Sequence, residues 1–180
     1  MNIDKAMYSE TGYSLERLNA LISPDAQNHL EQMAQRARQI TRQRFGNTIQ
    51  LYAPLYVSNF CVNNCPYCAF NCKSKLPRTR LTIDQAVKEA EILAAEGFRH
   101  ILIVSGEDKN FITVAYLTEL AKKLREKFSS ISIEIYPLTK EQYDQLFAAG
   151  IDSIALYQET YDRSDYEKFH KSGPKSDYDW

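Results

Sequence analysis

The sequence predicts an α/β fold built on a parallel sheet and preceded by N-terminal helices. Short runs rich in β-branched and aromatic residues alternate with longer segments in which apolar residues recur at helical spacing. One run, His100–Val104 (HILIV), is apolar throughout, which is typical of a strand covered on both faces. Predicted strands that are each followed by a helix favour right-handed βαβ units, in an open sheet or in a barrel.

The first part of the chain, residues 1–48, is predicted to be a helical segment. A short helix is expected near Leu15–Leu21. Ser23 and Pro24 then have the residue types of an N-cap and a first helical position, and apolar residues follow at helical spacing as far as Gly46. We expect the apolar side of this second helix to pack on a core.

From residue 49 the predicted strands and helices alternate. The segments with strand character are Ile49–Ser58, His100–Val104, Ile131–Tyr136 and Ile151–Tyr157. The expected helix signals are two capping boxes, Thr82 with Gln85 and Thr139 with Gln142, and helical spacing over Val114–Phe128 and Tyr161–Phe169.

Three polar stretches follow three of the predicted strands. Cys61–Cys68 follows the first strand, Ser105-Gly106-Glu107 the second, and Gln158-Glu159-Thr160 the fourth. The carboxyl ends of parallel strands meet at one rim of an α/β sheet, which is where ligands bind in such folds. We therefore expect the three stretches to lie together.

The composition excludes several classes of protein. The chain has 180 residues, a net charge of −1, 44% hydrophobic and 25% charged residues, so nothing indicates a nucleic-acid partner. No apolar run reaches the length of a membrane span, and the N-terminus lacks the apolar stretch of a secretory signal. We expect a cytoplasmic protein, in which clustered thiols more often bind metal than form disulfides.

Three of the four cysteines have the spacing C-x3-C-x2-C, from Cys61 through Cys65 to Cys68. A redox pair would use two of these thiols, and a structural zinc site usually has two separated pairs. Cys72 could supply a fourth ligand, but four thiolates from so short a loop would crowd a tetrahedral ion. Three thiolates suit a [4Fe–4S] cluster with one open iron, which can chelate S-adenosylmethionine. The cluster is the favoured interpretation, and zinc and redox chemistry remain alternatives.

This loop resembles that of the radical S-adenosylmethionine superfamily, C-x3-C-x-aromatic-C, with Tyr67 at the aromatic position. The resemblance implies that Tyr67 lies beside the adenine. A Gly-Gly-Glu-like stretch of the superfamily engages the methionyl amino group, and its counterpart here has a serine first, followed by Gly106 and Glu107. Glu159 is a further candidate for hydrogen bonding to S-adenosylmethionine. The alternatives are loop packing for Tyr67, solvation for Glu107 and a structural salt bridge for Glu159.

Longer stretches resemble the 2-iminoacetate synthase family, the tyrosine lyases of thiazole assembly in thiamine biosynthesis. In order they are PLYVSNFCVNNCPYCAF, LTIDQA, VSGE, IEIYPLTKEQYDQL and YQETYDRSDYEKFHKSGPKSDYDW. The resemblance implies that a 5′-deoxyadenosyl radical takes a hydrogen atom from the amino group of L-tyrosine. Cleavage of the Cα–Cβ bond then gives 2-iminoacetate (dehydroglycine) and p-cresol. The alternatives are the tyrosine lyase of [FeFe]-hydrogenase maturation and an inactive cluster-binding fragment.

The same resemblance implies a partial TIM-type (βα) barrel. The family barrel has about six to eight βα units, so residues 49–180, with about four, resemble the N-terminal half of a radical S-adenosylmethionine core. The implied partners are L-tyrosine, an electron donor of the flavodoxin or ferredoxin type, and thiazole synthase as a candidate, with no nucleic acid or membrane. We expect the chain alone to release little p-cresol, because groups that hold tyrosine should belong to the other half.

Overall fold

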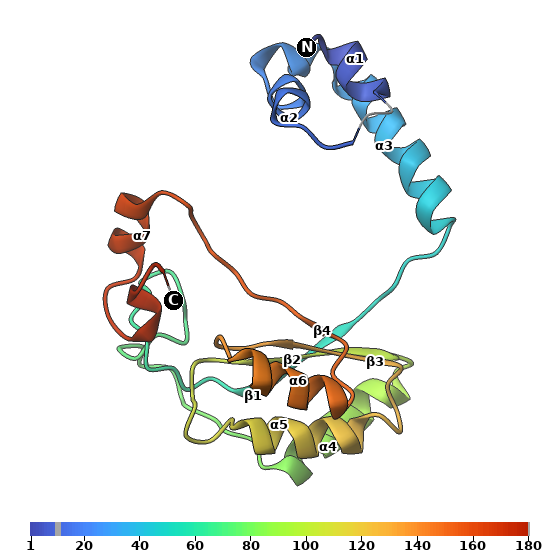
Figure 1. The fold of residues 1–180 in the computed structure, drawn as a ribbon. Helices are drawn as coiled ribbons and strands as arrows, with labels where there is room; N and C mark the ends of the chain where they lie inside the picture. The colour runs from blue at the N-terminus through green and yellow to red at the C-terminus, as the bar shows by residue number, and fades with distance from the viewer. Residues whose placement is uncertain (10–11, 180) are drawn as a thin grey trace. The chain divides into compact units, whose positions relative to one another are not determined.

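A computed structural model describes residues 1–9 and 12–179, so Trp180, the last residue of the predicted core, lies outside the described part (Figure 1). The chain forms two compact units, Met1–Ile49 and Gln50–Trp180. Within the described residues, no helix combines the length and apolar composition needed to cross a bilayer.

The first unit contains helices α1 (Ile3–Tyr8), α2 (Leu15–Leu21) and α3 (Leu30–Phe45) and a 3-10 helix, η1 (Pro24–His29). Helix α2 lies where the sequence predicts it. The single helix expected from Pro24 to Gly46 is wrong at its start, where η1 precedes α3. The Ser23 hydroxyl donates to the carbonyl of Ala20 and caps no backbone N–H of the next turn, so the expected N-cap interaction is absent.

Helix α3 also packs less than its apolar spacing predicts. None of its residues is buried, and Met33 makes its contact with the small cluster of Ile3, Met7 and Ala26. The helix ends at Gly46, whose φ of 66° lies in the left-handed region that glycine tolerates.

The second unit is built on a four-stranded sheet. Its strands are β1 (Ala53–Ser58), β2 (His100–Ser105), β3 (Ser130–Glu134) and β4 (Ser153–Ile154). They pair in the order β1-β2-β3-β4, and every pair is parallel. In a TIM-type barrel, each strand pairs in parallel with the strands that precede and follow it in the chain, and this sheet has that order. The predicted partial barrel of parallel strands is therefore confirmed. Strands β1 and β4 are shorter than predicted.

Helices α4 (Ile83–Ala95), α5 (Val114–Leu124) and α6 (Lys140–Ala148) lie on one face of the sheet (Figure 1). Both predicted capping boxes are present, at Thr82 with Gln85 and at Thr139 with Gln142. The chain then continues to α7 (Arg163–Phe169), capped by Asp162, and to the 3-10 helix η2 (Pro174–Ser176).

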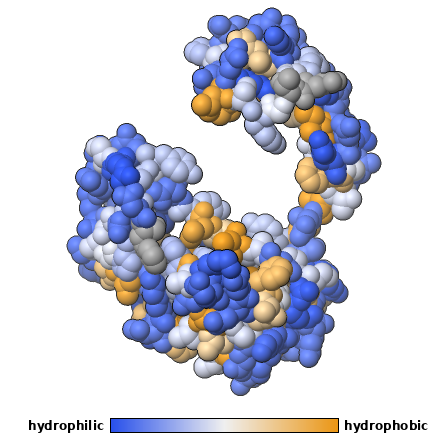
Figure 2. All heavy atoms as spheres, viewed as in Figure 1, coloured by the Kyte–Doolittle hydropathy of each residue, from blue (hydrophilic) through white to orange (hydrophobic). Residues whose placement is uncertain are grey.

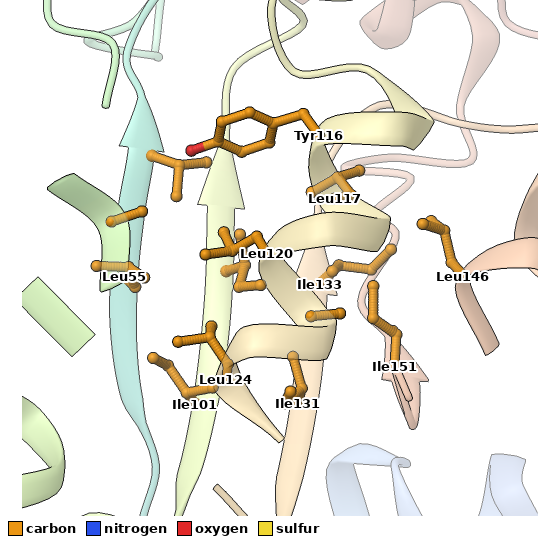
Figure 3. Packing of buried hydrophobic residues seen from close by; sticks show 14 of the residues in the cluster. Leu55, Ile101, Tyr116, Leu117, Leu120, Leu124, Ile131, Ile133, Leu146 and Ile151 are labelled. Atoms are coloured by element: carbon orange, nitrogen blue, oxygen red, sulfur yellow. The ribbon is translucent and has the colours of Figure 1, made fainter. Parts of the chain in front are cut away.

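The core lies between the sheet and these helices. Alternate strand residues such as Ile131 and Ile133 point toward α5, which contributes Leu117 and Leu120, and all four are at most 1% exposed (Figure 3). Among the described residues of this unit, no helix covers the other face of the sheet (Figure 1). Hydrophobic residues reach the surface of this unit (Figure 2), and among those near the strand ends are Tyr56, Ile154 and Leu156, each at least half exposed.

Replacing Leu120 by alanine should lower the free energy of unfolding by about 2–5 kcal/mol, because the side chain is fully buried and leaves a cavity. Ile92→Ala is the matched control, since Ile92 lies on α4 and is 56% exposed. Its change should stay within about 0.5 kcal/mol. Urea titrations followed by circular dichroism measure both, and equal losses in the two variants would contradict this packing.

Candidate functional site

A cavity of about 580 Å³ opens at the carboxyl ends of the strands. The loops that follow β1 to β4 and the segment beyond α7 all contribute to its wall. Every site residue predicted from the sequence lines it, namely Cys61, Cys65, Tyr67, Cys68, Gly106, Glu107 and Glu159. The three polar stretches therefore lie together at one rim, as the parallel topology predicts.

The cysteine loop is held in shape by backbone contacts and by one arginine. The N–H of Cys68 donates to the carbonyl of Cys65 at 3.0 Å, which closes a turn between these two thiols. The Arg78 guanidinium donates to four carbonyl groups along the loop, those of Asn59, Phe70, Asn71 and Ser74. A planar cation with five N–H donors is suited to gathering several carbonyls at once.

The thiols of this loop differ in environment. Burial raises the pKa of Cys65, and the neighbouring charges of Cys61 and Cys68 add to the rise. The thiol of Cys68 accepts a hydrogen bond from the N–H of Phe70 at 3.4 Å. Cys72 is exposed and does not line the cavity.

This donor set fits an iron–sulfur cluster better than the alternatives do. All four cysteines are free thiols, and three of them line the cavity together. Among the described residues, no three Cys, His, Asp or Glu side chains are arranged to hold a single metal ion. A cluster with four irons bridges thiolates that stand further apart than the ligands of one zinc ion. Cys61, Cys65 and Cys68, on the wall of a roomy cavity, could hold such a cluster.

Gly106 brings the loop after β2 against the cysteine loop. Its N–H donates to the carbonyl of Ser58 at 3.1 Å. A Cβ atom at this position would lie 2.3 Å from the carbonyl oxygen of Phe60 and 2.9 Å from Cβ of Cys61, which no side chain could tolerate. The glycine is therefore required for packing at the rim, a reason that the sequence pattern does not reveal.

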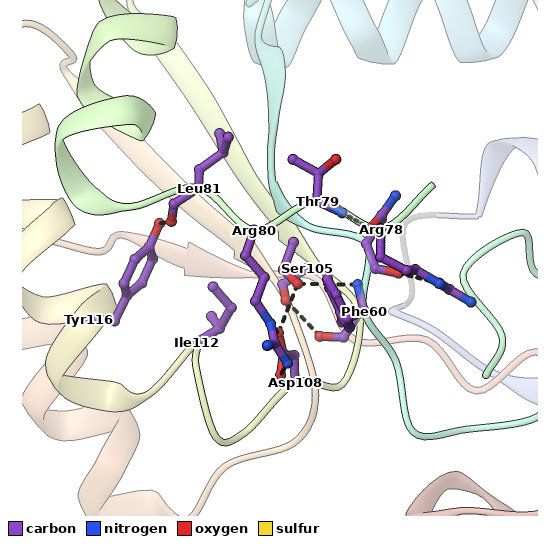
Figure 4. Close-up of polar contacts among 12 residues, drawn as sticks. Phe60, Arg78, Thr79, Arg80, Leu81, Ser105, Asp108, Ile112 and Tyr116 are labelled. Carbon is purple, nitrogen blue, oxygen red and sulfur yellow. Dashed lines mark hydrogen bonds and ion pairs between the residues drawn. The ribbon is translucent and has the colours of Figure 1, made fainter. Parts of the chain in front are cut away.

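Asp108, in the same loop after β2, has a buried carboxylate that accepts three hydrogen bonds from two side chains (Figure 4). Arg80 donates to it through two nitrogens, at 2.7 and 2.8 Å, and the hydroxyl of Ser58 donates at 2.9 Å. The Arg80 guanidinium also lies 3.9 Å from the ring centre of Phe60. These contacts join the end of β1 to the loop after β2 and fix the backbone beside Glu107.

His170 anchors Tyr67, a role that could not be assigned from the sequence. Its Nδ1 lies 2.9 Å from the carbonyl oxygen of Tyr166, which can only accept, so Nδ1 carries the proton. Its Nε2 then accepts from the hydroxyl of Tyr67 at 2.7 Å. The imidazole is 2% exposed and stacks on the ring of Tyr166 at 3.8 Å. The orientation of Tyr67 is set by these two bonds.

Two ionisable side chains near the thiols, Tyr67 and Glu159, have shifted pKa values. Burial raises the pKa of Tyr67 far above its usual value, helped by the charges of Cys65 and Glu159, so its hydroxyl remains a donor. Burial would raise the pKa of Glu159, but the hydrogen-bonded Lys175 ammonium at 2.7 Å lowers it overall. The salt bridge that the sequence left as an alternative for Glu159 is thus present, on the wall of the cavity.

Five residues of the site were not predicted, namely Asn63, Arg78, Arg80, His170 and Lys175. Asn63 had a usable signal, because it lies inside the cysteine motif. The others had none, since their contacts depend on the fold; His170 is 103 residues from the tyrosine that it binds.

A parallel sheet with three thiols at the carboxyl ends of its strands defines a class of cluster-binding α/β protein. The comparison with known proteins identifies that class. Residues 55–180 match the model of the Radical SAM superfamily, and the chain belongs to this superfamily. Its members use a [4Fe–4S] cluster and S-adenosylmethionine, the two cofactors expected from the sequence.

Within the superfamily, the chain is 42% identical over 161 residues to 2-iminoacetate synthase of Escherichia coli, covering 89% of this chain and 43% of that protein. It is 32% identical over 154 residues to 3-methylornithine synthase of Methanosarcina acetivorans, covering 84% of this chain and 44% of the relative. A crystal structure of HydG, a maturase of the [FeFe]-hydrogenase, superposes with a TM-score of 0.88 at 34% identity. That superposition covers 98% of this chain and 40% of HydG. The chain thus spans less than half the length of the relatives that it matches.

Arg78→Lys should speed amide hydrogen exchange across residues 59–74 by about tenfold, because a lysine ammonium cannot reach all four carbonyls. Arg99→Lys is the matched control, since Arg99 also binds two carbonyls, those of Ala94 and Phe98, away from the cysteine loop. Exchange followed by mass spectrometry reads both variants. Unchanged protection of residues 59–74 in Arg78→Lys would show that the loop holds its shape without this arginine.

Proposed function

We propose that this chain carries the cofactor-binding core of a radical tyrosine lyase of the 2-iminoacetate synthase type. The observation that carries the proposal is the convergence of three thiols and two carboxylates on one cavity at the strand ends. The 42% identity to 2-iminoacetate synthase over most of this chain supports the reaction type.

Cys61, Cys65 and Cys68 would hold the [4Fe–4S] cluster. With S-adenosylmethionine bound, the cluster supplies a one-electron reductive cleavage that generates a 5′-deoxyadenosyl radical. The protein's part is to hold the donor set still, and the Arg78 contacts and the turn between Cys65 and Cys68 do so.

Four residues would bind S-adenosylmethionine. Glu107, 6% exposed, would offer a carboxylate to the methionyl amino group, and Gly106 beside it would border the ligand where its loop packs against the cysteine loop. Tyr67, fixed by His170, would lie along the adenine, and Glu159 would accept hydrogen bonds while Lys175 holds it. Apolar residues, Tyr56 among them, would form part of the wall around the reacting atoms.

The substrate would be L-tyrosine, cleaved at its Cα–Cβ bond to 2-iminoacetate and p-cresol. A second candidate is the tyrosine lyase of [FeFe]-hydrogenase maturation, favoured by the superposition on HydG. A chain that binds a cluster without turnover is the third.

The remaining parts of the proposal concern the setting of the reaction. Residues 1–48 would form the N-terminal helical segment and residues 49–180 the incomplete radical S-adenosylmethionine core. An electron donor of the flavodoxin or ferredoxin type would reduce the cluster, thiazole synthase would be a downstream partner, and the protein would act in the cytoplasm.

Anaerobic reconstitution should load about four irons and four sulfides per chain. Alanine at Cys61, Cys65 or Cys68 should abolish the brown chromophore, because each thiolate holds a different iron. Cys72→Ala should retain it, since Cys72 lies outside the cavity wall. Absorbance and iron analysis measure the outcome, and loss of the cluster in the Cys72 variant alone would refute this ligand set.

Reconstituted chain, S-adenosylmethionine, L-tyrosine and a reductant should give 5′-deoxyadenosine with far less than one equivalent of p-cresol. The sheet face beside the cavity is open at Ile154 and Leu156, so tyrosine is poorly positioned and solvent can quench the radical. Chromatography measures both products.

The same assay separates the parts of the proposal. L-Tyrosine should accelerate formation of 5′-deoxyadenosine and L-lysine should not; equal rates would count against tyrosine as the substrate. Near-stoichiometric p-cresol would contradict the argument from the open face. Failure to cleave S-adenosylmethionine at all would contradict the radical chemistry.

A further inference from the structure

Asn63 lies in the middle of the cysteine motif and is 3% exposed. Both polar atoms of its buried side chain form hydrogen bonds. Its amide nitrogen donates to Oε2 of Glu107 at 2.6 Å and to Sγ of Cys61 at 3.5 Å. Its amide oxygen accepts from the backbone N–H of Lys175 at 2.9 Å. One side chain thus touches a candidate cluster ligand, a candidate ligand of S-adenosylmethionine and the C-terminal segment.

The C-terminal segment is shaped to hold this asparagine. The N–H of Asn64 donates to the carbonyl of Ser172 at 3.0 Å, and the N–H of Lys171 donates to the carbonyl of Asn64 at 3.1 Å. Gly173 has a φ of 92°, and a Cβ there would lie 2.4 Å from the amide oxygen of Asn63. The segment passes the side chain so closely that Asn63 cannot rotate away from its partners.

We propose that Asn63 is a positioning residue that couples the Cys61 thiolate to the Glu107 carboxylate. The proposal rests on the proposed function, in which Cys61 holds the cluster and Glu107 binds S-adenosylmethionine. Asn63 would raise the reduction potential of the cluster and hold Glu107 in the orientation that the methionyl amino group requires.

The effect on the potential follows from charge. Reduction adds a negative charge to the cluster, and an N–H group directed at a ligand sulfur stabilises that charge, so losing the donor lowers the potential. The effect on Glu107 follows from how its two oxygens are held. Lys109 lies 2.9 Å from Oε1 and Asn63 holds Oε2, so removing the amide frees one of the two oxygens.

The residue type is specific to this task. An amide supplies two N–H donors for Glu107 and Cys61 and one oxygen for the Lys175 N–H. Leucine has a similar volume and can neither donate nor accept. A serine hydroxyl supplies a single donor and cannot reach all three partners.

The experiment compares Asn63→Leu with Asn64→Leu in the reconstituted 180-residue chain. Asn64 is the matched control because it is the same residue type in the same loop, and within the described residues its side chain forms no hydrogen bond. The readouts are the midpoint potential from a titration followed by electron paramagnetic resonance and the affinity for S-adenosylmethionine from equilibrium dialysis. Neither requires turnover.

Asn63→Leu should show a more negative midpoint potential and roughly tenfold weaker binding of S-adenosylmethionine, whereas Asn64→Leu should match the wild type on both. A wild-type potential and affinity in Asn63→Leu, or equal changes in both variants, would overturn the inference. If circular dichroism shows that the buried leucine prevents folding, the same two measurements are made on Asn63→Ser, with the same expected changes. A wild-type chain that assembles no cluster would instead overturn the proposed function, and this inference with it.

Discussion

The buried carboxylate of Asp108 is the interaction on which the site depends. A charge removed from water has to be paired and hydrogen-bonded, and Arg80 with Ser58 meets both needs. The pairing draws the segment that carries Arg80 against the end of β1, where Ser58 and Arg80 form an isolated antiparallel bridge. The N–H of Asn59 donates to the carbonyl of Thr79 just beyond this bridge. The cysteine loop is therefore closed at its base, and the thiols project from a loop whose two ends are fixed.

The parts of the fold that follow from local chemistry could be predicted from the sequence. Thr82 and Thr139 cap their helices because each capping box needs only residues within one turn. The prediction failed where distant or competing contacts decide. Ser23 has the right residue type for an N-cap, yet its hydroxyl turns back to Ala20. Residues 49–52 have strand character but lie before the stretch that β2 can pair with, which begins opposite Ala53.

The candidate site divides in the same way. The spacing of the cysteines and the position of Glu107 after a strand are sequence properties, and the structure places both on one cavity. The contacts that orient these side chains depend on the fold and cannot be read from the motif. Lys175 reaches Glu159 and Asn63 only because the chain returns across the cysteine loop after α7. Periodicity and spacing describe single elements, whereas these contacts join different elements, and the one between Lys175 and Asn63 links residues 112 positions apart.

The exposure of Cys72 has a consequence for how the loop withstands damage. A thiol reacts with oxidants and electrophiles as its thiolate, so accessibility and acidity together set the rate. Cys72 is open to solvent, while Cys65 is buried and burial raises the pKa of its thiol. Reagents in solution can therefore reach Cys72 directly, whereas the burial of Cys65 limits their access to its thiol. The thiol of the loop that is most accessible to reagents is thus the one that does not line the cavity.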